Sequence, residues 1–352
     1  MKLFIINVGG TSTKLGIFEN NQEIQSESII HEEKLFLECG TIWEQLPFRK
    51  AAVLAYLAKE KLDLSKFDAI VSRGPSVKPL ASGVYQIDEN MLADAKSQQY
   101  GEHPCGIGCQ IAFDLANNQI PALTVDPPSV DEMIPSARYT GLPMLKRKSF
   151  FQALNHKAVA HRLAHQLGKK YTELNLVVSH LGSGISVASH QNGRVVDVTN
   201  GLDGDAPFGL DRTGTLPAAD WMKLILSGEY TELELFNLIN GGGGIKAYLG
   251  TNNALEVEKR IAQGDLKAAE VYDAMAFQVA KGIGAASAVF TSSVDGIILT
   301  GGLANSKLFT DNVRKRVEKM APVYIFPGED EMLALAEGAL RGLSGQEEVK
   351  IY

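Results

Sequence analysis

The sequence has too few cysteines, in the wrong arrangement, for a disulfide framework or a structural zinc site. It contains three, Cys39, Cys105 and Cys109, which is an odd number. The one close pair has the spacing CGIGC, whereas redox and zinc sites commonly use CxxC. We therefore expect reduced thiols in a cytoplasmic protein.

Long apolar runs and clusters of one charge sign are also missing. The apolar run at the N-terminus, Leu3–Ile6, is short and has no small-residue cleavage site, so it predicts a first β-strand and not a signal peptide. No stretch approaches the length of a membrane-spanning helix. The formal net charge of −7, without a long Lys/Arg run, argues against nucleic acid and membrane surfaces as partners. A small-molecule or protein partner is expected instead.

The common nucleotide-binding and metalloprotease motifs are absent. No segment matches GxxxxGK[ST], and the GxG at 182–184 runs into an apolar strand pattern, whereas the dinucleotide-binding fingerprint opens a helix. His161 and His165 are four residues apart, but HRLAH lacks the glutamate of HExxH. We expect no zinc site there.

Two stretches of the sequence share one pattern. Leu3–Phe18 reads LFIINVGGTSTKLGIF, and Leu176–Ser189 reads LVVSHLGSGISVAS. Each has an apolar run, a polar residue, a turn of small residues and a second apolar run. A strand that enters such a turn and then resumes exposes backbone N–H groups and hydroxyls at a tight bend, which suits a phosphate. Asn7 and His180 hold equivalent positions before the two turns.

The repetition extends to the elements that follow each turn. Three predicted strands, then alternating helices and strands, are typical of a mixed sheet covered on both faces. We predict two α/β domains, 1–150 (joined by a C-terminal helix at about 330–352) and 151–329, with a hinge near 150 and the ligand in a cleft between them. The predicted strands include 68–72, 122–125, 174–179, 184–189, 194–198, 296–299 and 323–326, and the predicted helices 47–62, 89–98, 108–117, 149–167, 218–227, 231–238, 255–263, 267–292, 305–319 and 330–343.

A third glycine turn follows a predicted buried strand, in the segment LTGGLANS. Its paired glycines, Gly301 and Gly302, would let a flat ligand lie against the backbone, and Asn305 or Ser306 can cap the next helix. Such turns are common, so this motif alone is weak evidence. The four glycines at 241–244 fit a helix C-cap and loop as well as they fit a ligand contact.

Seven motifs occur along the chain in a characteristic order. They are NxG followed by Ser/Thr and Lys, SRGP, VDPPSVDEM, SHLGSG, DRTGTLP, LTGGLANS and PGEDEMLALAEGAL. Together they cover essentially the whole chain and resemble the acetate and butyrate kinase family. The length and the forms SRGP, VDPPSVDEM and ALAEGALRGL are more similar to the butyrate kinase branch than to the longer acetate kinases. The resemblance implies an actin-like fold of duplicated ribonuclease H-like domains, with residues 151–329 as the nucleotide-binding domain.

The resemblance also implies roles for the first turn. Asn7 and the hydroxyls of Thr11 and Ser12 match the family's first phosphate turn, with Lys14 just beyond it. One departure is visible, because acetate kinases usually carry a serine where this chain has Gly10. One hydroxyl is thus replaced by backbone alone.

Further roles come from the other motifs. His180 matches the histidine that the family directs at the transferring phosphoryl group, and Arg73 and Arg212 match the arginines that hold the carboxylate and that group. A guanidinium clamps such anions bidentately, and a phosphoryl transition state needs cations and donors more than a strong base. Gly182, Ser183 and Gly184 match the second phosphate turn, and Gly301, Gly302 and Asn305 the adenosine contact.

The resemblance implies Mg²⁺ as cofactor, with ATP or ADP as co-substrate. Asp126 matches the strand-end aspartate beside the reacting oxygen, and Glu331 the C-terminal acidic residue associated with Mg²⁺, with Asn7 as a further ligand. A carboxylate substrate is already ionised at pH 7, so Asp126 need not act as a base. Asp131 is a rival for the metal role of Asp126, and Glu329 and Asp330 are rivals for that of Glu331.

Each of these residues also has a purely structural interpretation. Asn7 could bond its own turn, and His180 alone would more often be a core histidine. Arg73 and Arg212 alone would more often be surface ion-pair partners, and Arg212 follows Asp211. Asp126 precedes two prolines and could form a turn, while acidic residues near 331 suit any helix N-terminus.

The sequence therefore predicts a transferase that forms butyryl phosphate and ADP reversibly from butyrate and ATP. Acetate, propionate or a branched acid remains an alternative, because the motifs do not cover the acyl pocket. A nucleotide-switched chaperone or filament protein of the same fold is an alternative of another class; the retained arginines and His180 argue against it. By the family's habit we expect a homo-oligomer.

Overall fold

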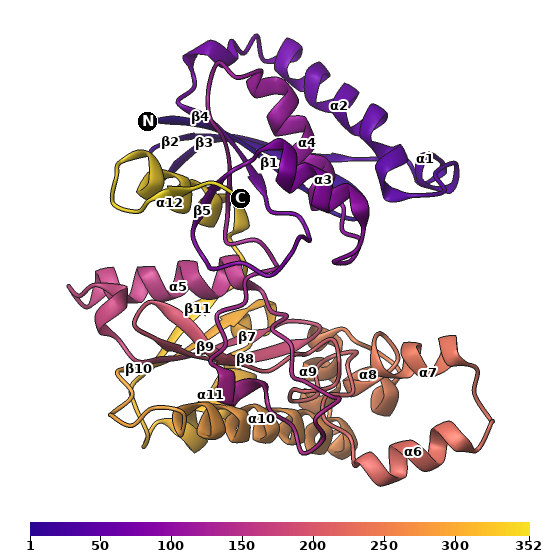
Figure 1. The fold of residues 1–352 in the computed structure, drawn as a ribbon. Helices are drawn as coiled ribbons and strands as arrows, with labels where there is room; N and C mark the ends of the chain where they lie inside the picture. Colours follow the sequence, from indigo (N-terminus) through magenta and orange to yellow (C-terminus); the bar gives the residue numbers. More distant parts are fainter. The chain divides into compact units, whose positions relative to one another are not determined.

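Uninterrupted apolar runs form the central strands of two separate sheets in the computed structural model, which describes residues 1–352 (Figure 1). The chain divides into two compact units, Met1–Val130 with Asp330–Tyr352, and Asp131–Glu329. The first unit therefore combines the indigo and purple part of the ribbon with its yellow C-terminal end. The boundary lies at 130/131, before the position near 150 that we expected from the sequence.

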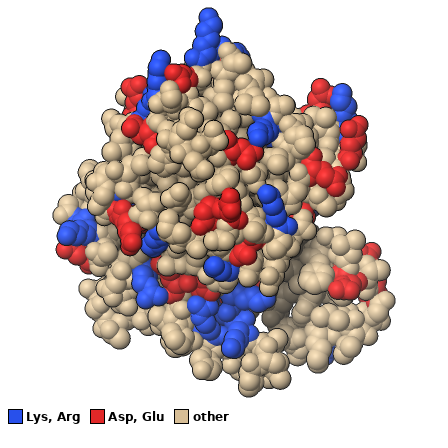
Figure 2. Space-filling view, turned by 45° about the horizontal axis from the view of Figure 1, so that its top comes forward, with Lys and Arg blue, Asp and Glu red and all other residues tan.

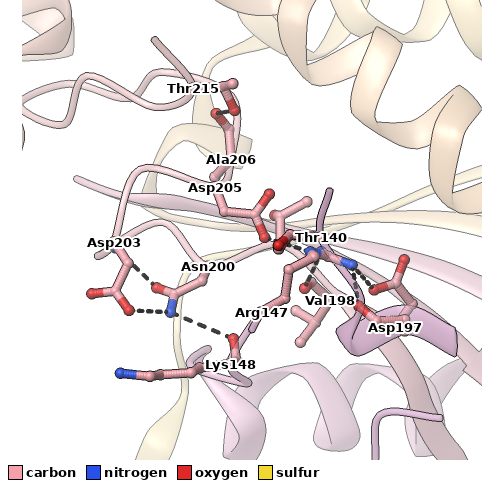
Figure 3. A network of polar contacts seen from close by, with 12 residues as sticks. Thr140, Arg147, Lys148, Asp197, Val198, Asn200, Asp203, Asp205, Ala206 and Thr215 are labelled. Atoms are coloured by element: carbon pink, nitrogen blue, oxygen red, sulfur yellow. Dashed lines mark hydrogen bonds and ion pairs between the residues drawn. The ribbon is translucent and has the colours of Figure 1, made fainter. Parts of the chain in front are cut away.

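Polar contacts tie the segment 131–150 to the second unit. The backbone N–H of Ile134 donates to the carbonyl of Val196 at 2.9 Å. Arg147 reaches Asp197 through Nη1 and Asp205 through Nε, both at 2.7 Å, and Figure 3 shows its guanidinium between the two carboxylates. A segment held by two ion pairs and a main-chain bond packs as part of that unit.

Seven strands form the sheet of the first unit. They are β1 (Lys2–Val8), β2 (Ser12–Glu19), β3 (Gln22–Ile30), β4 (Ala69–Arg73), β5 (Val84–Gln86), β6 (Ala122–Val125) and β12 (Val349–Lys350). Their order is β12-β5-β6-β4-β1-β2-β3. Because β4 is parallel to both β1 and β6, the carboxyl ends of these three strands meet at one edge of the sheet.

Helices cover this sheet. α12 begins where Asp330 accepts the backbone N–H of Leu333 at 3.1 Å, and it packs against β1, β4 and β6. The predicted helix at 330–343 is thereby confirmed, with Asp330 as its cap. The helices are α1 (Glu33–Leu37), α2 (Leu46–Lys59), α3 (Glu89–Ser97), α4 (Cys105–Ala116) and α12 (Glu331–Leu343), with short 3₁₀ turns at Ile42–Gln45 and Leu64–Lys66.

Five strands form the sheet of the second unit. They are β7 (Leu176–Leu181), β8 (Ile185–Gln191), β9 (Arg194–Val198), β10 (Gly296–Gly301) and β11 (Val323–Pro327), in the order β11-β10-β7-β8-β9. The pairing repeats that of the first unit. β1 and β7 each pair antiparallel with the next strand and parallel with a later one. The duplication expected from the sequence is present at the level of strand pairing.

Two helices sandwich the second sheet. α10 packs against β7 and β8, and α5 against β7 and β10. Neighbouring residues of β7 belong to different cores, with Val177 in the cluster on the α10 side and Val178 in the cluster on the α5 side, as the strand period of two requires. The helices are α5 (Ala153–Gln166), α6 (Ala218–Leu226), α7 (Glu232–Ile239), α8 (Gly244–Leu249), α9 (Ala254–Ala262), α10 (Leu266–Ser287) and α11 (Lys307–Val317), with 3₁₀ turns at Pro135–Arg138, Tyr171–Glu173 and Gly302–Asn305.

Some predicted boundaries were wrong. The helix expected over 267–292 ends at Ser287, and Ser292 and Ser293 instead accept hydrogen bonds from the side chain of Asn175. The short elements β5 and α8 were not predicted, because a strand of three residues and a helix that opens on glycine carry little periodic signal.

None of the helices combines the length and the apolar character needed to span a membrane. Basic and acidic side chains are interspersed over the face shown in Figure 2, apart from one group of adjoining basic side chains near its lower edge. This mixed surface agrees with the absence of a long basic run in the sequence.

Candidate functional site

The first turn lies between β1 and β2 and presents an exposed backbone. Gly10 and Thr11 are exposed, and neither backbone N–H donates to a protein acceptor. At the end of β1, the side-chain amide nitrogen of Asn7 donates to Glu331 Oε2 at 2.6 Å, which leaves the buried Asn7 Oδ1 without a hydrogen-bond partner. A buried carbonyl oxygen with no donor is rare in folded proteins and calls for a ligand or an ion.

The other predicted residues of this unit lie at the same edge of the sheet. Arg73 ends β4, beside β1, and its Nη1 pairs with Glu331 Oε1 at 2.7 Å. Glu331 therefore receives a donor on each oxygen, one from Asn7 and one from Arg73. Lys14 is an exposed residue of β2 that pairs in register with Asn7.

Asp126 follows β6 in a strained conformation. Its φ is +40°, a region that L-residues rarely adopt, and its side chain is 3% exposed. Its Oδ1 accepts the backbone N–H of Gly83 at 2.8 Å. Such strain persists where the surroundings hold it in place and is concentrated at functional sites. The rival Asp131 lies in the second unit, where Arg138 bonds both of its carboxylate oxygens at 2.7 Å.

The three acidic residues before and at the start of α12 have separate roles in the structure. Glu329 lies 3.0 Å from His180 Nε2, within the second unit. Asp330 caps the helix, and Glu331 binds Asn7 and Arg73. The three neighbours thus contact three different sets of groups.

The second turn follows β7, whose next-to-last residue is His180. The side-chain nitrogen of Asn155 lies 2.9 Å from His180 Nδ1 and also donates to Thr300 Oγ1 at 3.1 Å. Because an amide NH₂ group can only donate, Nδ1 accepts and a ring proton lies on Nε2. Nε2 then donates to Glu329 at 3.0 Å. The histidine is held in one tautomer with its N–H directed at an acidic group.

A stack of buried histidines continues behind His180. His156 stacks on His180 with ring centroids 6.1 Å apart and on His190 at 5.6 Å. Burial holds the pKa of both His156 and His190 well below the ordinary value, so both are neutral at pH 7. His156 Nε2 bonds Ser186 at 2.9 Å, and His190 Nδ1 bonds Tyr171 at 2.7 Å.

A loop that carries Arg212 packs on the second turn. The backbone N–H of Leu210 donates to the carbonyl of Ser183 at 3.0 Å. A Cβ at Gly184 would lie 3.5 Å from Arg212 Cγ, so the arginine side chain runs along the turn. Its Nε pairs with Asp211 at 3.1 Å, while its terminal nitrogens donate to no protein acceptor. The ion pair expected from sequence adjacency therefore occupies only part of the guanidinium.

The third glycine turn has the expected open backbone. Gly301 adopts φ +88°, and a Cβ there would lie 2.6 Å from the carbonyl oxygen of Leu181. Gly302 is exposed with no atom near its Cβ position, and Asn305 donates to the Gly302 carbonyl at 3.0 Å. The cap of α11 is Ser306, whose Oγ accepts the N–H of Phe309 at 2.9 Å.

A separate pocket lies beside α7. Its volume is about 500 Å³, within the range of small-molecule sites, and Gly241 and Gly242 form part of its lining. Lys246, also in the lining, donates to the Gly241 carbonyl at 2.8 Å. The glycine run therefore borders a pocket, whereas the sequence left open whether it was only a helix end.

The sequence did not point to three residues that contact these turns or act on the predicted site residues. Asn155 fixes the His180 ring, and Arg49 bonds the first turn from behind. His103 has its pKa lowered to about 4 by burial and by the charge of Arg73, so it is neutral at pH 7. None carried a signal in the sequence, because Asn155 and Arg49 lie within ordinary helical patterns and His103 precedes a proline in a loop.

The oxygen ligands in the first unit suit a hard cation. No group of three or more His, Cys, Asp or Glu side chains is arranged to hold a metal ion. Mg²⁺, however, usually takes one or two carboxylates and completes its shell with water and substrate phosphate. The orphaned Asn7 Oδ1 and the carboxylate of Glu331 fit that ligand chemistry.

The comparisons with known proteins point to one family. Residues 124–337 match the profile described as the acetokinase family. "Butyrate kinase 2" of Clostridium acetobutylicum is 49% identical over 352 residues, covering 100% of this chain and 99% of that protein. "Probable butyrate kinase" of Listeria welshimeri is 45% identical over 348 residues, covering 99% and 98%.

The fold is shared with a solved structure. The acetate kinase of Porphyromonas gingivalis superimposes with a TM-score of 0.78 at 17% identity, covering 96% of this chain and 99% of that one. The predicted fold class, duplicated actin-like α/β domains with mixed sheets, is thereby confirmed.

Proposed function

The chain belongs to the acetokinase family, and from this premise we propose that it transfers the γ-phosphoryl group of ATP reversibly to butyrate, giving butyryl phosphate and ADP. We choose butyrate as the substrate because the chain is 49% and 45% identical, over its full length, to two proteins named as butyrate kinases. The chemistry needs cationic and N–H donors around a phosphoryl group and a clamp for a carboxylate.

Two arginines provide the clamps in this proposal. Arg212 directs its terminal nitrogens at the transferring phosphoryl group, and its position along the second turn supports this role. Arg73 holds the substrate carboxylate, and Glu331 orients its guanidinium at 2.7 Å. Asp126 positions the reacting groups at the end of β6, with no need to remove a proton.

Donors of the two turns stabilise the negative charge that develops in the transition state. His180 donates from Nε2, since Asn155 holds its Nδ1 as an acceptor. The backbone of Gly182 and Gly184 and the hydroxyl of Ser183 bind phosphate in the second unit, and Thr11, Ser12 and Lys14 do so in the first. Adenosine lies against Gly301, Gly302 and Asn305, where the exposed Gly302 leaves the backbone accessible.

Asn7, Glu331 and Asp126 are the proposed ligands of Mg²⁺. When bound, Mg²⁺ would neutralise charge on the phosphate oxygens. The unpartnered Asn7 Oδ1 is the observation that supports this choice.

We further propose a cytoplasmic homo-oligomer. All three cysteines are free thiols, which suits a reducing compartment. Large apolar side chains are exposed on α6 and α7, including Leu226 at 75%, Leu233 at 71% and Phe236 at 61%. Contiguous exposed apolar side chains commonly mark subunit interfaces.

Trapping of acyl phosphate as hydroxamate tests the proposed function. The purified chain is assayed with Mg-ATP and a panel of acetate, propionate, butyrate and branched short acids. We expect the highest kcat/KM with butyrate. Arg212→Ala should lower kcat by about 100-fold or more, as for the loss of a transition-state donor. Arg260→Ala, which removes an ion pair with Asp265 outside the site, is the matched control and should keep its turnover.

The panel of acids distinguishes an error in the proposed substrate from an error in the proposed reaction. A preference for another acid would retain a carboxylate kinase and reject butyrate as its substrate. No hydroxamate with any acid would reject the proposed function. Near-normal kcat in Arg212→Ala would remove the role assigned to that arginine.

A further inference from the structure

Arg49, on α2, is a completely buried arginine with no acidic partner. Its side chain is 0% exposed and is the largest fully buried side chain in the protein. Its partners are two backbone carbonyls, a hydroxyl and the side-chain carbonyl of Gln45, and it forms no ion pair with a carboxylate. Buried arginines are ordinarily paired with an acid, because an isolated charge in a protein interior is costly.

The guanidinium is bonded to the back of the first turn. Nη2 donates to the carbonyl of Gly10 at 2.6 Å, and Nη1 donates to the carbonyl of Ser12 at 2.9 Å and to Thr13 Oγ1 at 3.2 Å. These bonds span the turn from one end to the other. The fork geometry of the guanidinium suits two carbonyls at once, which an ammonium could not match.

The surroundings of Arg49 hold it in place without neutralising it. The rings of Phe36 and Phe48 lie 5.3 Å and 5.7 Å from its central carbon. Burial lowers its pKa to about 10, so it remains charged at pH 7. His31, which bonds Thr13 at 2.8 Å, has its pKa lowered by burial and by the Arg49 charge. The positive charge is thus left without compensation inside the unit.

The front of the same turn faces outward with free donors. The backbone N–H groups of Gly10 and Thr11 donate to no protein acceptor. The carbonyl that Arg49 binds at Gly10 belongs to the same peptide unit as the N–H of Thr11. A cation on the carbonyl polarises the peptide and strengthens its N–H as a donor.

We propose that Arg49 is a positioning residue that holds the turn 9–13 in the shape that binds a phosphoryl group, and that the bound anion neutralises its buried charge. This inference rests on the proposed function, since that function places a phosphate at this turn. Arg49 does not touch the ligand; it acts through the Gly10–Thr11 peptide.

Arg147 provides a matched comparison within the same chain. It is also largely enclosed, but it pairs with two carboxylates, those of Asp197 and Asp205 (Figure 3). Its charge is already compensated, so anion binding should not depend on it. A purely structural arginine would behave in this way.

The test measures binding of inorganic phosphate through its effect on thermal unfolding, in the wild type and in Arg49→Met, Arg49→Lys and Arg147→Met. The shift caused by phosphate is compared within each variant, so that losses of stability without ligand cancel. We expect the phosphate Kd to rise about tenfold in Arg49→Met and by less in Arg49→Lys, which keeps the charge but loses the fork. Arg147→Met should unfold at a lower temperature and keep the wild-type Kd. Adenosine, which carries no phosphate, should bind all four proteins equally.

An unchanged phosphate Kd in Arg49→Met would overturn the inference. If Arg49→Met does not fold, the phosphate Kd of Arg49→Lys tests the inference instead. A wild-type phosphate Kd in Arg49→Lys would then overturn the inference. A weaker phosphate affinity together with an equally weakened adenosine affinity would point to general damage and also count against it. The proposed function fails separately, through absence of wild-type hydroxamate formation, and the phosphate titration still decides the role of Arg49.

Discussion

The turns after β1 and β7 occupy equivalent places in two sheets with the same strand pairing, yet the two units support them differently. The first turn is an exposed backbone held from behind by the guanidinium of Arg49, which bonds the Gly10 and Ser12 carbonyls. The second turn is packed against its own unit, because the N–H of Leu210 donates to the Ser183 carbonyl. The donor that we singled out beside it is a side chain, that of His180.

The difference shows that two copies of one module can present different chemical groups at equivalent positions. The next-to-last residue of each strand contacts a glutamate, Asn7 with Glu331 at 2.6 Å and His180 with Glu329 at 3.0 Å. The first unit thus offers backbone donors and an orphaned amide oxygen, which suit a phosphate and a cation. The second offers an imidazole fixed in one tautomer and a free arginine fork. A phosphoryl transition state needs both kinds of group.

Gly209→Ala should give the largest effect on stability, because it tests the close packing of the second turn. A Cβ at Gly209 would lie 2.2 Å from the Ser183 carbonyl oxygen, a contact that backbone movement alone can relieve. We expect a loss of about 2–4 kcal/mol in the free energy of unfolding, measured by urea denaturation. Gly264→Ala, which has open space but a φ of +92°, serves as a control for strain without a clash. Equal stability of Gly209→Ala and the wild type would show that the second turn is not tightly packed.

Acid should weaken the second unit through the histidine stack behind His180. His156 and His190 have lowered pKa values in the folded protein, so only the unfolded chain takes up their protons. Their contribution is fully present above the unfolded pKa of about 6.5 and is lost as pH falls below it, by about 1.4 kcal/mol per pH unit for each histidine.

Urea unfolding at pH 7 and pH 5.5 measures this loss. His190→Asn, which removes one titrating group, should lose less stability between the two pH values than the wild type does. An identical loss in the two proteins would mean that folding does not lower the pKa of His190.

Gly10→Ser should have the smallest effect on stability, because the first turn is open where the second is packed. No atom lies within 4 Å of a Cβ at Gly10, and its φ is not in the left-handed region. We expect the free energy of unfolding to change by less than about 0.5 kcal/mol in thermal or urea unfolding. A loss of unfolding free energy as large as that of Gly209→Ala would show that the first turn is packed as tightly as the second.

The sequence predicted the site residues that lie near strand ends but not the residues that support them. Residues near strand ends were visible, because Asn7, His180 and Gly301 each come at or shortly after the end of an apolar run. Supporting residues were not, because Arg49 and Asn155 come from helices that meet the turns only after folding. The sequence could not show which contacts each acidic residue of 329–331 makes. Only the fold decides that Glu329 faces His180 and that Glu331 faces Asn7 and Arg73.

The fold followed more directly from the sequence. Apolar runs and their repetition predicted the paired sheets. The boundary near residue 150 was misplaced, because the ion pairs of Arg147 with Asp197 and Asp205 join residues far apart in the sequence. Short elements such as α8 carried too little periodicity to be predicted.

By itself the sequence determined where the chain forms strands, where it turns on glycine and which polar residues stand at the turns, because these depend on local periodicity and conformational freedom. Only the tertiary structure decided what supports each turn. A buried arginine behind one and an amide-locked histidine beside the other depend on contacts between distant segments, and the cost of burying a polar group is set by the partners that folding brings to it.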